Sequence, residues 1–269
     1  MALARRDDAG VQRALAPRLL LGLGIAFLAL PLLGLLTRVP WPQLADQFAA
    51  AALHRALGLS LVCSLAAAIL AGLLGLPLAH WLASGRSRAR TVVRVLVVLP
   101  MVLPPVVAGL ALLLAFGREG LVGQTLAALT GIQIAFTPIA VVLAGSYIAL
   151  PFFVLAVESG LRGVDRRYLE AAATLGAGPS RRFREVTLPL MAPALRAGLL
   201  LAWARALGEF GATITFAGNV EGTTRTLPLA VYTALETSPD AAIAFSLILV
   251  LVSITVLVLL RHRWFPGQT

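Results

Sequence analysis

Lysine is absent from the sequence, cysteine occurs once, and charged residues of both signs are scarce. Charged residues make up 13% of the 269 residues and apolar residues 59%. A soluble domain carries roughly a quarter charged residues and at most about half apolar ones, so this composition excludes an ordinary soluble domain and indicates a membrane protein. The basic residues are all arginines spread between apolar runs. The net charge of +10 is therefore better explained by anionic headgroups on one side of a membrane than by nucleic acid, which we do not expect as a partner.

The scarcity of cysteine and histidine limits the chemistry that this chain can perform. Cys63 lies alone inside an apolar run, and His54, His80 and His262 lie far apart in sequence. No spacing typical of a metal site occurs, so we predict neither a metal site nor a catalytic residue. An intramembrane hydrolase would be one alternative and could use Ser146. However, no histidine lies within a credible partner helix, and no HExxH motif exists.

Six apolar stretches are long enough to cross a bilayer core of about 30 Å, which takes roughly 20 helical residues. None alternates like a barrel strand, so helices remain. We therefore predict an all-α integral membrane protein with six transmembrane helices. The first stretch could instead be a signal peptide, but its 18 apolar residues and the lack of a small-x-small pattern after it favour a retained helix. The expected spans are Leu19–Leu36, Leu57–Ala83, Val95–Ala115, Pro138–Val157, Ala197–Phe216 and Ala241–Leu260.

The arginines are distributed unevenly between the two sides of these spans. With the N-terminus in the cytosol, 17 of the 22 arginines fall in cytosolic segments. Four fall outside, namely Arg38, Arg55, Arg118 and Arg225, and Arg205 lies within the fifth span. Because positive residues accumulate on the cytosolic side, we predict that both termini are cytosolic, in a multi-pass protein of the cytoplasmic (inner) membrane.

The fourth and fifth spans are joined by a predicted cytosolic loop, residues 158–193. Asp165 can cap a helix over Arg166–Leu175, and Gly176 can end it. Pro179 suits the first turn of a second short helix, which Thr187-Leu188-Pro189 would end. One face of these helices is apolar and arginines lie on the other side, so the loop alone would also fit a segment that rests on lipid headgroups. The apolar residues are Tyr168, Leu169, Ala172, Leu175, Phe183 and Val186.

The spacing within this loop points to a more specific function. Glu170-Ala171-Ala172 is followed by Gly176 and, after nine intervening residues, by Val186-Thr187-Leu188-Pro189. This pattern resembles the EAA loop of ABC importer permeases, with Val186 where isoleucine is usual. The resemblance implies a coupling helix that docks in a groove of a cytosolic ABC ATPase subunit. The candidate ATPase-coupling residues are Glu170, Ala171, Ala172, Gly176, Val186, Leu188 and Pro189.

Two further segments, 99–120 and 205–232, are similar to the molybdate branch of this family, and sulfate and thiosulfate permeases are similar in the fifth span. Pro100, Pro104 and Pro105 should interrupt the third helix, either to line a pathway or only for packing. Arg205 and Glu209 share a helical face. They are either a pair that holds two helices together or part of the pathway. A pathway for a doubly charged anion should bind its cargo only weakly, and neutral hydrogen-bond donors provide such weak contacts. The pore and gate candidates are Pro104, Pro105, Arg205, Glu209, Thr213, Thr215 and Asn219.

The resemblance implies the division of the chain and its partners. Residues 1–52 would form a cytosolic tail, an additional first helix and a periplasmic segment; residues 53–262 would form the transmembrane domain of the importer, and residues 263–269 a cytosolic tail. The chain lacks GxxxxGK[ST], so ATP and Mg would bind to the partner ATPase. We expect no cofactor on this chain. Six helices are too few to enclose a gated pore, which predicts a homodimer within membrane lipid. A periplasmic or extracellular molybdate-binding protein would deliver the cargo; tungstate and sulfate remain alternatives. An ion-coupled secondary transporter would instead show inverted repeats and several membrane carboxylates.

Overall fold

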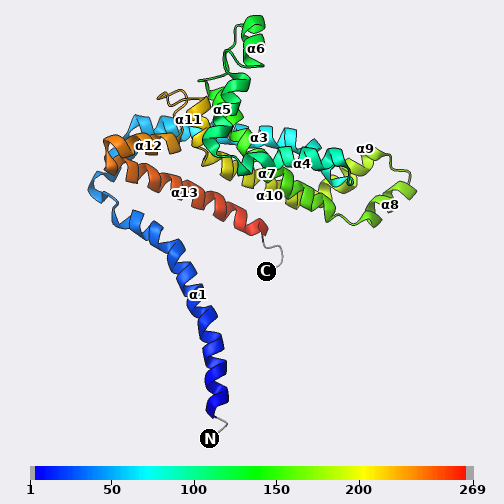
Figure 1. The fold of residues 1–269 in the computed structure, drawn as a ribbon, viewed down its shortest axis with the longest axis horizontal. Helices are drawn as coiled ribbons and strands as arrows, with labels where there is room; N and C mark the ends of the chain where they lie inside the picture. Colours follow the sequence, from blue (N-terminus) through cyan, green and yellow to red (C-terminus); the bar gives the residue numbers. More distant parts are fainter. Residues whose placement is uncertain (1–3, 265–269) are drawn as a thin grey trace.

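A computed structural model describes residues 4–264 of the chain, and the side chains between residues 17 and 258. Every element within these residues is helical (Figure 1). The first half contains α1 (Ala4–Thr37), η1 (Trp41–Gln43), α2 (Leu44–Ala49), α3 (Ala51–Ala83), α4 (Arg88–Val102), α5 (Pro105–Phe116) and α6 (Gly123–Thr130). The second half contains α7 (Pro138–Arg162), α8 (Arg166–Thr174), α9 (Pro179–Arg182), η2 (Phe183–Thr187), α10 (Leu188–Leu207), α11 (Gly211–Phe216), α12 (Leu227–Thr237) and α13 (Pro239–Trp264).

The centre of the molecule is a bundle in which α3, α7 and α10 pack against one another. Its core is built largely from alanine, with Phe153 of α7 as the largest buried side chain. A Cβ atom at Gly75 would come within 2.6 Å of the Phe153 ring. Small residues let apolar helices approach closely where no hydrophobic driving force exists between them, as in a lipid environment. The bundle therefore has the packing of membrane helices.

Five described helices are long and apolar enough to cross a membrane, and a sixth span results if the bent pair of α4 and α5 counts as one. This pair is bent by 119° at the break between its two helices. The break lies at Leu103 and Pro104, where prolines were expected to interrupt the third span. Pro100 does not contribute to it, because it lies inside α4. The all-α membrane architecture is thus present, with a third span that bends sharply.

The fifth span differs from its predicted bounds. We expected one helix over Ala197–Phe216, but α10 ends at Leu207 and a new short helix, α11, begins at Gly211. At the other end, the helical run that can cross a membrane begins already at Pro179. The span is therefore displaced toward the loop, and its predicted outer end is broken into a separate helix.

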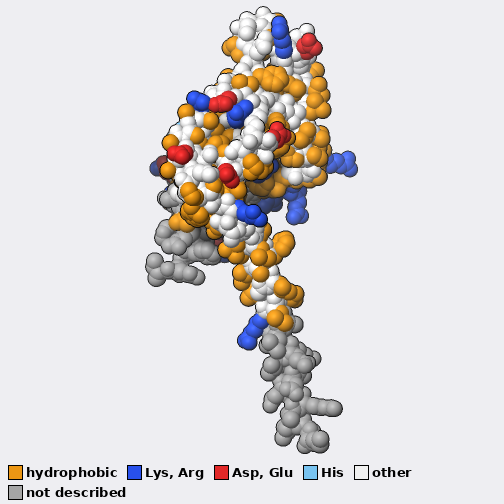
Figure 2. Space-filling model, turned by 90° about the vertical axis from the view of Figure 1, so that its left-hand side faces the viewer, with side chains coloured by type: hydrophobic (Ala, Val, Ile, Leu, Met, Phe, Trp, Pro, Cys, Tyr) orange, Lys and Arg blue, Asp and Glu red, His pale blue; other side chains and the backbone are white. Residues whose placement is uncertain are grey.

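The two ends of the bundle differ in character. α8 and α9 lie together at one end, which we call the loop end, and α12 and the start of α13 lie at the opposite end (Figure 1). Figure 2 looks at this opposite end, where acidic and basic side chains lie side by side. α1 extends away from the bundle (Figure 1), and none of its residues between Pro17 and Thr37 that form the apolar span is buried within the chain.

Candidate functional site

α8 is bounded by the two capping residues that the sequence predicts. The Asp165 carboxylate accepts a hydrogen bond from the backbone N–H of Arg167 (3.0 Å), which caps the N-terminus. At the C-terminus Gly176 has φ +79°. The N–H of Ala177 donates to the carbonyl of Ala172 (2.9 Å) and that of Gly176 to Ala173 (3.0 Å), which are the two bonds of a Schellman motif. The left-handed glycine therefore both ends α8 and redirects the chain toward α9.

The predicted apolar face of α8 is divided in two. Leu169 and Ala172 are half-buried and turn toward the bundle, whereas Tyr168 is 58% and Leu175 87% exposed. Glu170 is exposed as well. A helix that binds only its own chain would bury its large apolar residues, so the exposed tyrosine and leucine leave α8 with a surface that another molecule can cover.

The second helix of the loop does not end at Thr187-Leu188-Pro189, and this prediction is wrong. α9 continues through the π-helical turn η2 directly into α10, and the N–H of Leu188 bonds to the carbonyl of Phe183, five residues back. Proline lacks a donor, and its ring clashes with the carbonyl four residues earlier in an α-helix. The wider π turn accommodates Pro189 without a break. Half-buried Val186 and Leu188 and exposed Pro189 thus lie within a continuous helix.

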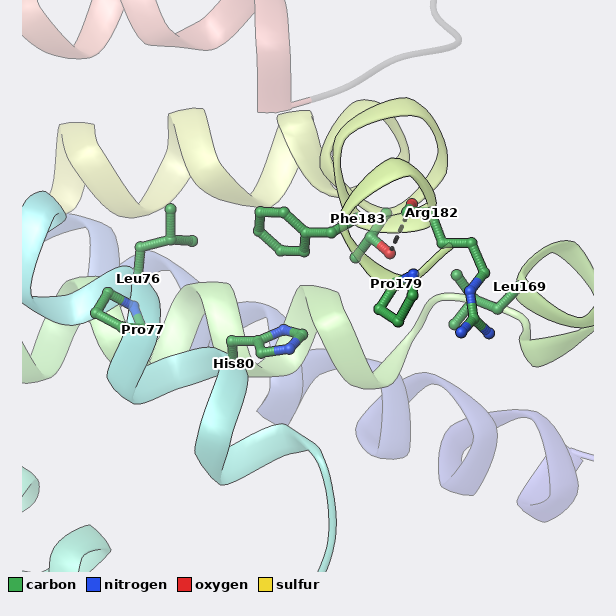
Figure 3. A pocket seen from close by; sticks show the side chains of 8 residues that line it. Leu76, Pro77, His80, Leu169, Pro179, Arg182 and Phe183 are labelled. Atoms are coloured by element: carbon green, nitrogen blue, oxygen red, sulfur yellow. Dashed lines mark hydrogen bonds between the residues drawn. The ribbon is translucent and has the colours of Figure 1, made fainter. Parts of the chain in front are cut away.

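A groove of about 480 Å³ lies between α3 and the helices of the loop (Figure 3). Leu76, Pro77 and His80 of α3 line one side, and Leu169, Pro179, Arg182, Phe183 and Thr187 line the other. The rings of His80 and Phe183 meet edge to face, with their centroids 5.3 Å apart. The loop is therefore held beside α3 but leaves an open space at this contact.

A buried carboxylate that the sequence analysis did not single out fixes the base of the loop. Glu158 of α7 is 5% exposed. One of its oxygens accepts hydrogen bonds from Arg94 of α4 and from Arg162 one helical turn further on, the latter at 2.8 and 3.0 Å. Arg162 also donates to the carbonyl of Leu82 at the end of α3 (3.2 Å). This cluster ties α3, α4 and α7 together, and its member Arg162 lies three residues before Asp165. The spacing of Glu158 and Arg162 could have indicated the local pair, but not Arg94.

The two interrupted helices meet at their breaks. A Cβ atom at Gly211 would lie 2.7 Å from Cβ of Pro105, and one at Gly109 would lie 2.7 Å from the carbonyl oxygen of Ala212 and 2.8 Å from Cβ of Thr215. α5 and α11 therefore pack at backbone distance, which only glycine permits at these two positions. The structure thus brings the predicted pore candidate Pro105 together with the segment 209–215. Pro104 is exposed beside it.

Arg205 and Glu209 form an ion pair of 2.8 Å (Arg205 Nη1 to Glu209 Oε2), with the glutamate side chain 2% and the arginine 31% exposed. The other oxygen of Glu209 accepts the N–H of Ala212 (2.9 Å). Two interpretations of this pair were open, a link between two helices or a part of the pathway. The pair bridges the break between α10 and α11, where the carboxylate accepts a hydrogen bond from a free backbone donor at the start of the new helix.

The neutral donors do not lie together as an open row. Thr213 is 1% exposed, and the Thr215 hydroxyl donates to the carbonyl of Gly211 (2.8 Å). Asn219 accepts from Arg225 Nε (2.9 Å) and donates to Thr233 (2.9 Å). Arg225 also pairs with Glu221, which Arg55 contacts at 2.7 Å. The hydrogen bond from Arg55 is the main cause that lowers the pKa of Glu221. Asn219 is thus part of the polar network that shapes the segment between α11 and α12.

Among the described residues no three His, Cys, Asp or Glu side chains are grouped as metal ligands. The Ser146 hydroxyl donates to the carbonyls of Val142 (2.6 Å) and Ala67 (3.2 Å), so it serves helix packing. The bundle of long apolar helices, with its bent third span, defines a multi-pass membrane protein.

The comparisons with known proteins agree with this class. The chain belongs to the family of inner membrane components of binding-protein-dependent transport systems, whose model matches residues 71–266. It is 48% identical to the molybdenum transport system permease protein ModB of Mycobacterium tuberculosis, over 86% of this chain and 87% of that protein. It is 43% identical to ModB of Escherichia coli K12, over 59% of this chain and 69% of that protein. The family is one of transport permeases and not of catalytic enzymes, and it places the chain in the inner membrane.

The fold is similar to that of a solved chain from a bacterial alginate ABC transporter in complex with a periplasmic protein. The TM-score is 0.71 at 16% identity, over 96% of this chain and 94% of that chain. At this identity the likeness concerns the fold alone. The family model matches residues 71–266, which include the loop, so the resemblance to importer permeases that the loop motif indicated is confirmed.

Proposed function

We propose that this chain is the channel-forming subunit of an ATP-driven importer that carries molybdate across the cytoplasmic membrane. The observation that carries the cargo assignment is the 48% identity to a molybdenum transport permease along most of both chains. The mechanism follows from three parts of the structure, which are the exposed helix α8, the buried cluster at its base and the contact between the two broken helices.

The loop is the proposed site at which ATP hydrolysis on a separate subunit reaches the membrane. Glu170, Ala171 and exposed Tyr168 and Leu175 form the outer surface of α8, which suits a groove on an ABC ATPase. The Gly176 cap fixes the direction of α8, and Val186, Leu188 and Pro189 join the loop rigidly to α10. ATP and Mg would be bound by the partner, with no cofactor on this chain. Movement of α8 would then be transmitted to α7 and α10 as a lever.

The proposed gate is the contact of α5 with α11. The backbones touch through Gly109 and Gly211, so a small displacement of either helix changes the packing at Pro104 and Pro105. In the Arg205–Glu209 pair the glutamate neutralises the positive charge of the arginine, and a neutralised arginine does not bind a dianion tightly. Thr213, Thr215 and Asn219 support the shape of this region through buried packing and hydrogen bonds. Contact with the passing anion would therefore be brief.

Two copies of the chain would enclose the pathway. The apolar span of α1 buries no residue within its own chain, and α5 exposes large apolar residues such as Val106, Leu110 and Leu114. Both surfaces need cover from lipid or a second copy, and a two-fold dimer supplies the second half of the pore. A periplasmic molybdate-binding protein would dock at the opposite end from the loop.

The orientation that this mechanism needs has six spans and both termini in the cytosol. In a Cys63→Ala background, cysteines at Gly85 and Gly178 should react with an impermeant thiol reagent only from the cytosolic side, and cysteines at Gly120 and Pro239 only from the periplasmic side. The reason is the arginine asymmetry of the connecting segments. Labelling of the Gly178 site from the periplasm would contradict the position of the coupling loop.

The cargo is tested by transport with competing anions. The permease, reconstituted in liposomes with the ATPase subunit and the binding protein from its own system, should take up radioactive molybdate in an ATP-dependent manner. Excess tungstate is expected to reduce the initial rate at least tenfold, because both are tetrahedral dianions of similar size, and sulfate less than twofold. Stronger competition by sulfate than by tungstate would favour the sulfate permease as the alternative function. Uptake that follows an ion gradient without ATP would contradict the importer itself.

A further inference from the structure

The groove beside the loop continues into a second one. The first groove, of about 480 Å³, is lined by apolar side chains such as Leu76, Pro77 and Phe183 (Figure 3). The second, of about 430 Å³, is lined by Ala83, Ser84, Leu161, Arg162, Val164 and Arg166. His80, Leu169 and Thr187 line both grooves. We call the two together the loop trough, since they adjoin along the last turns of α3.

The trough changes from apolar to polar along α3. Leu76 lines its inner part, and Ala83 and Ser84 at the end of the helix line its outer part. Seven residues of helix separate Leu76 from Ala83, which is a rise of about 10 Å. Trp81 lies on the same stretch, 38% exposed, with the guanidinium of Arg90 5.2 Å from its ring centre. Tryptophan and arginine mark the headgroup level of a membrane. With the orientation proposed above, the polar part of the trough therefore lies at the cytosolic headgroups and the apolar part at the acyl chains.

The charge of the trough has one sign. Arg182 lines the apolar part and Arg162 and Arg166 the polar part, and no aspartate or glutamate is among the described residues that line either groove. Arg162 is already paired with Glu158. The Nε atom of Arg182, in contrast, is buried without a hydrogen-bond partner within the described chain. The buried Nε itself is closed to a group in the trough, but Arg182 forms no ion pair with a described carboxylate, so an anionic oxygen beside its guanidinium in the trough would compensate the charge.

We propose that the loop trough binds an anionic phospholipid of the cytosolic leaflet, with the phosphate between Arg166 and Arg182 and an acyl chain along Leu76, Pro77 and Phe183. The order of polarity along α3 matches that of a lipid, and a basic pocket between helices at the cytosolic side is suited to an acidic headgroup. The lipid would fill the space between α3 and the coupling helix and so support the position of α8. The inference depends on the proposed orientation, but not on the cargo.

The test measures lipid binding by the purified permease in complex with its ATPase subunit. Native mass spectrometry should show retention of phosphatidylglycerol at least five times stronger than that of phosphatidylcholine with the same chains. Glycerol 3-phosphate, which offers the headgroup chemistry without chains, should not compete at millimolar concentration. In the variant with Arg166→Gln and Arg182→Gln the preference should fall below twofold. Arg167→Gln is the matched control, because Arg167 neighbours Arg166 on α8 and lines neither groove; it should keep the full preference.

The position of the lipid is checked separately with phosphatidylglycerol that carries a photoactivatable acyl chain. Crosslinks are expected in residues 76–84 and 179–187. Equal retention of the two lipids, an unchanged preference in the double variant, or crosslinks confined to other helices would overturn the proposal. Crosslinking of the ATPase subunit to Leu76 or His80 through a photoreactive side chain at these positions would also overturn it, because the trough would then be a protein interface. None of these measurements requires transport, so a failed uptake experiment leaves them valid.

Discussion

Replacement of Arg94 and Arg162 together by methionine is expected to lower the folded yield of the permease far more than replacement of Glu158 by glutamine. The two changes remove the same ion pairs but leave different groups behind. The Glu158 side chain is 6% exposed, whereas those of Arg94 and Arg162 are 43% and 40% exposed. Without the arginines, a buried carboxylate has no cation, which costs about 3–5 kcal/mol. Without the carboxylate, both guanidinium groups can still reach water or headgroups.

The measurement is fluorescence-detected size exclusion of the detergent-solubilised chain, together with its melting temperature. Glu158→Gln should cost about 1.5–3 kcal/mol, the usual range for a hydrogen bond that involves a charged group. The triple variant with Glu158→Gln, Arg94→Met and Arg162→Met should recover most of the yield that the arginine double variant loses. Glu185→Gln is the control, since Glu185 pairs with Arg181 on the exposed side of the loop (60% and 69% exposed, respectively), and such pairs contribute little. Equal losses for the double variant and Glu158→Gln would contradict the assignment of Glu158 as the buried anchor.

The local structure of the coupling loop could be predicted from the sequence because its signals act over a few residues. The Asp165 cap, the start of the second helix at Pro179 and the left-handed Gly176 depend on side chains at fixed positions relative to the helix ends. The apolar spans could be predicted equally well, because length and composition alone decide whether a helix can cross a bilayer. Each of these features would be present whatever the rest of the chain does.

Features that depend on distant contacts could not be derived in this way. Pro189 was expected to end a helix, but a π turn such as η2 can also accommodate a proline within a continuous helix. No local sequence pattern distinguishes these two outcomes. The break after Leu207 follows from the packing of Gly211 against Pro105, which lies over 100 residues earlier. The attachment of Arg94 to Glu158 likewise joins two helices whose pairing is set by the whole bundle. Asn219 was proposed as a contact for the anion from its residue type, and only the fold shows that its amide is bonded to Arg225 and Thr233.

Gly176→Val is expected to abolish ATP-driven uptake while leaving the membrane spans intact. A Cβ atom at Gly176 would meet nothing within 4 Å, so crowding does not oppose the substitution. The substitution is unfavourable because Gly176 has φ of +79°. This conformation costs a residue with a side chain about 1–2 kcal/mol, and a β-branched residue rarely adopts it. Valine would leave the left-handed region and break both bonds of the Schellman motif. The equilibrium would shift at least tenfold toward loops in which α8 points elsewhere.

Two controls separate this conformational effect from any effect of side-chain size in the loop. Gly178 has φ of −66° and equally open surroundings, so Gly178→Val adds the same side chain without strain and should retain activity. Gly176→Asn should retain most of it, because asparagine tolerates the left-handed conformation. All three variants should insert and dimerise. In reconstituted complexes, Gly176→Val should lose at least 90% of the ATP hydrolysis stimulated by loaded binding protein. Full stimulation in this variant would mean that the direction of α8 does not matter for coupling, and the loop would then be only a segment at the membrane surface.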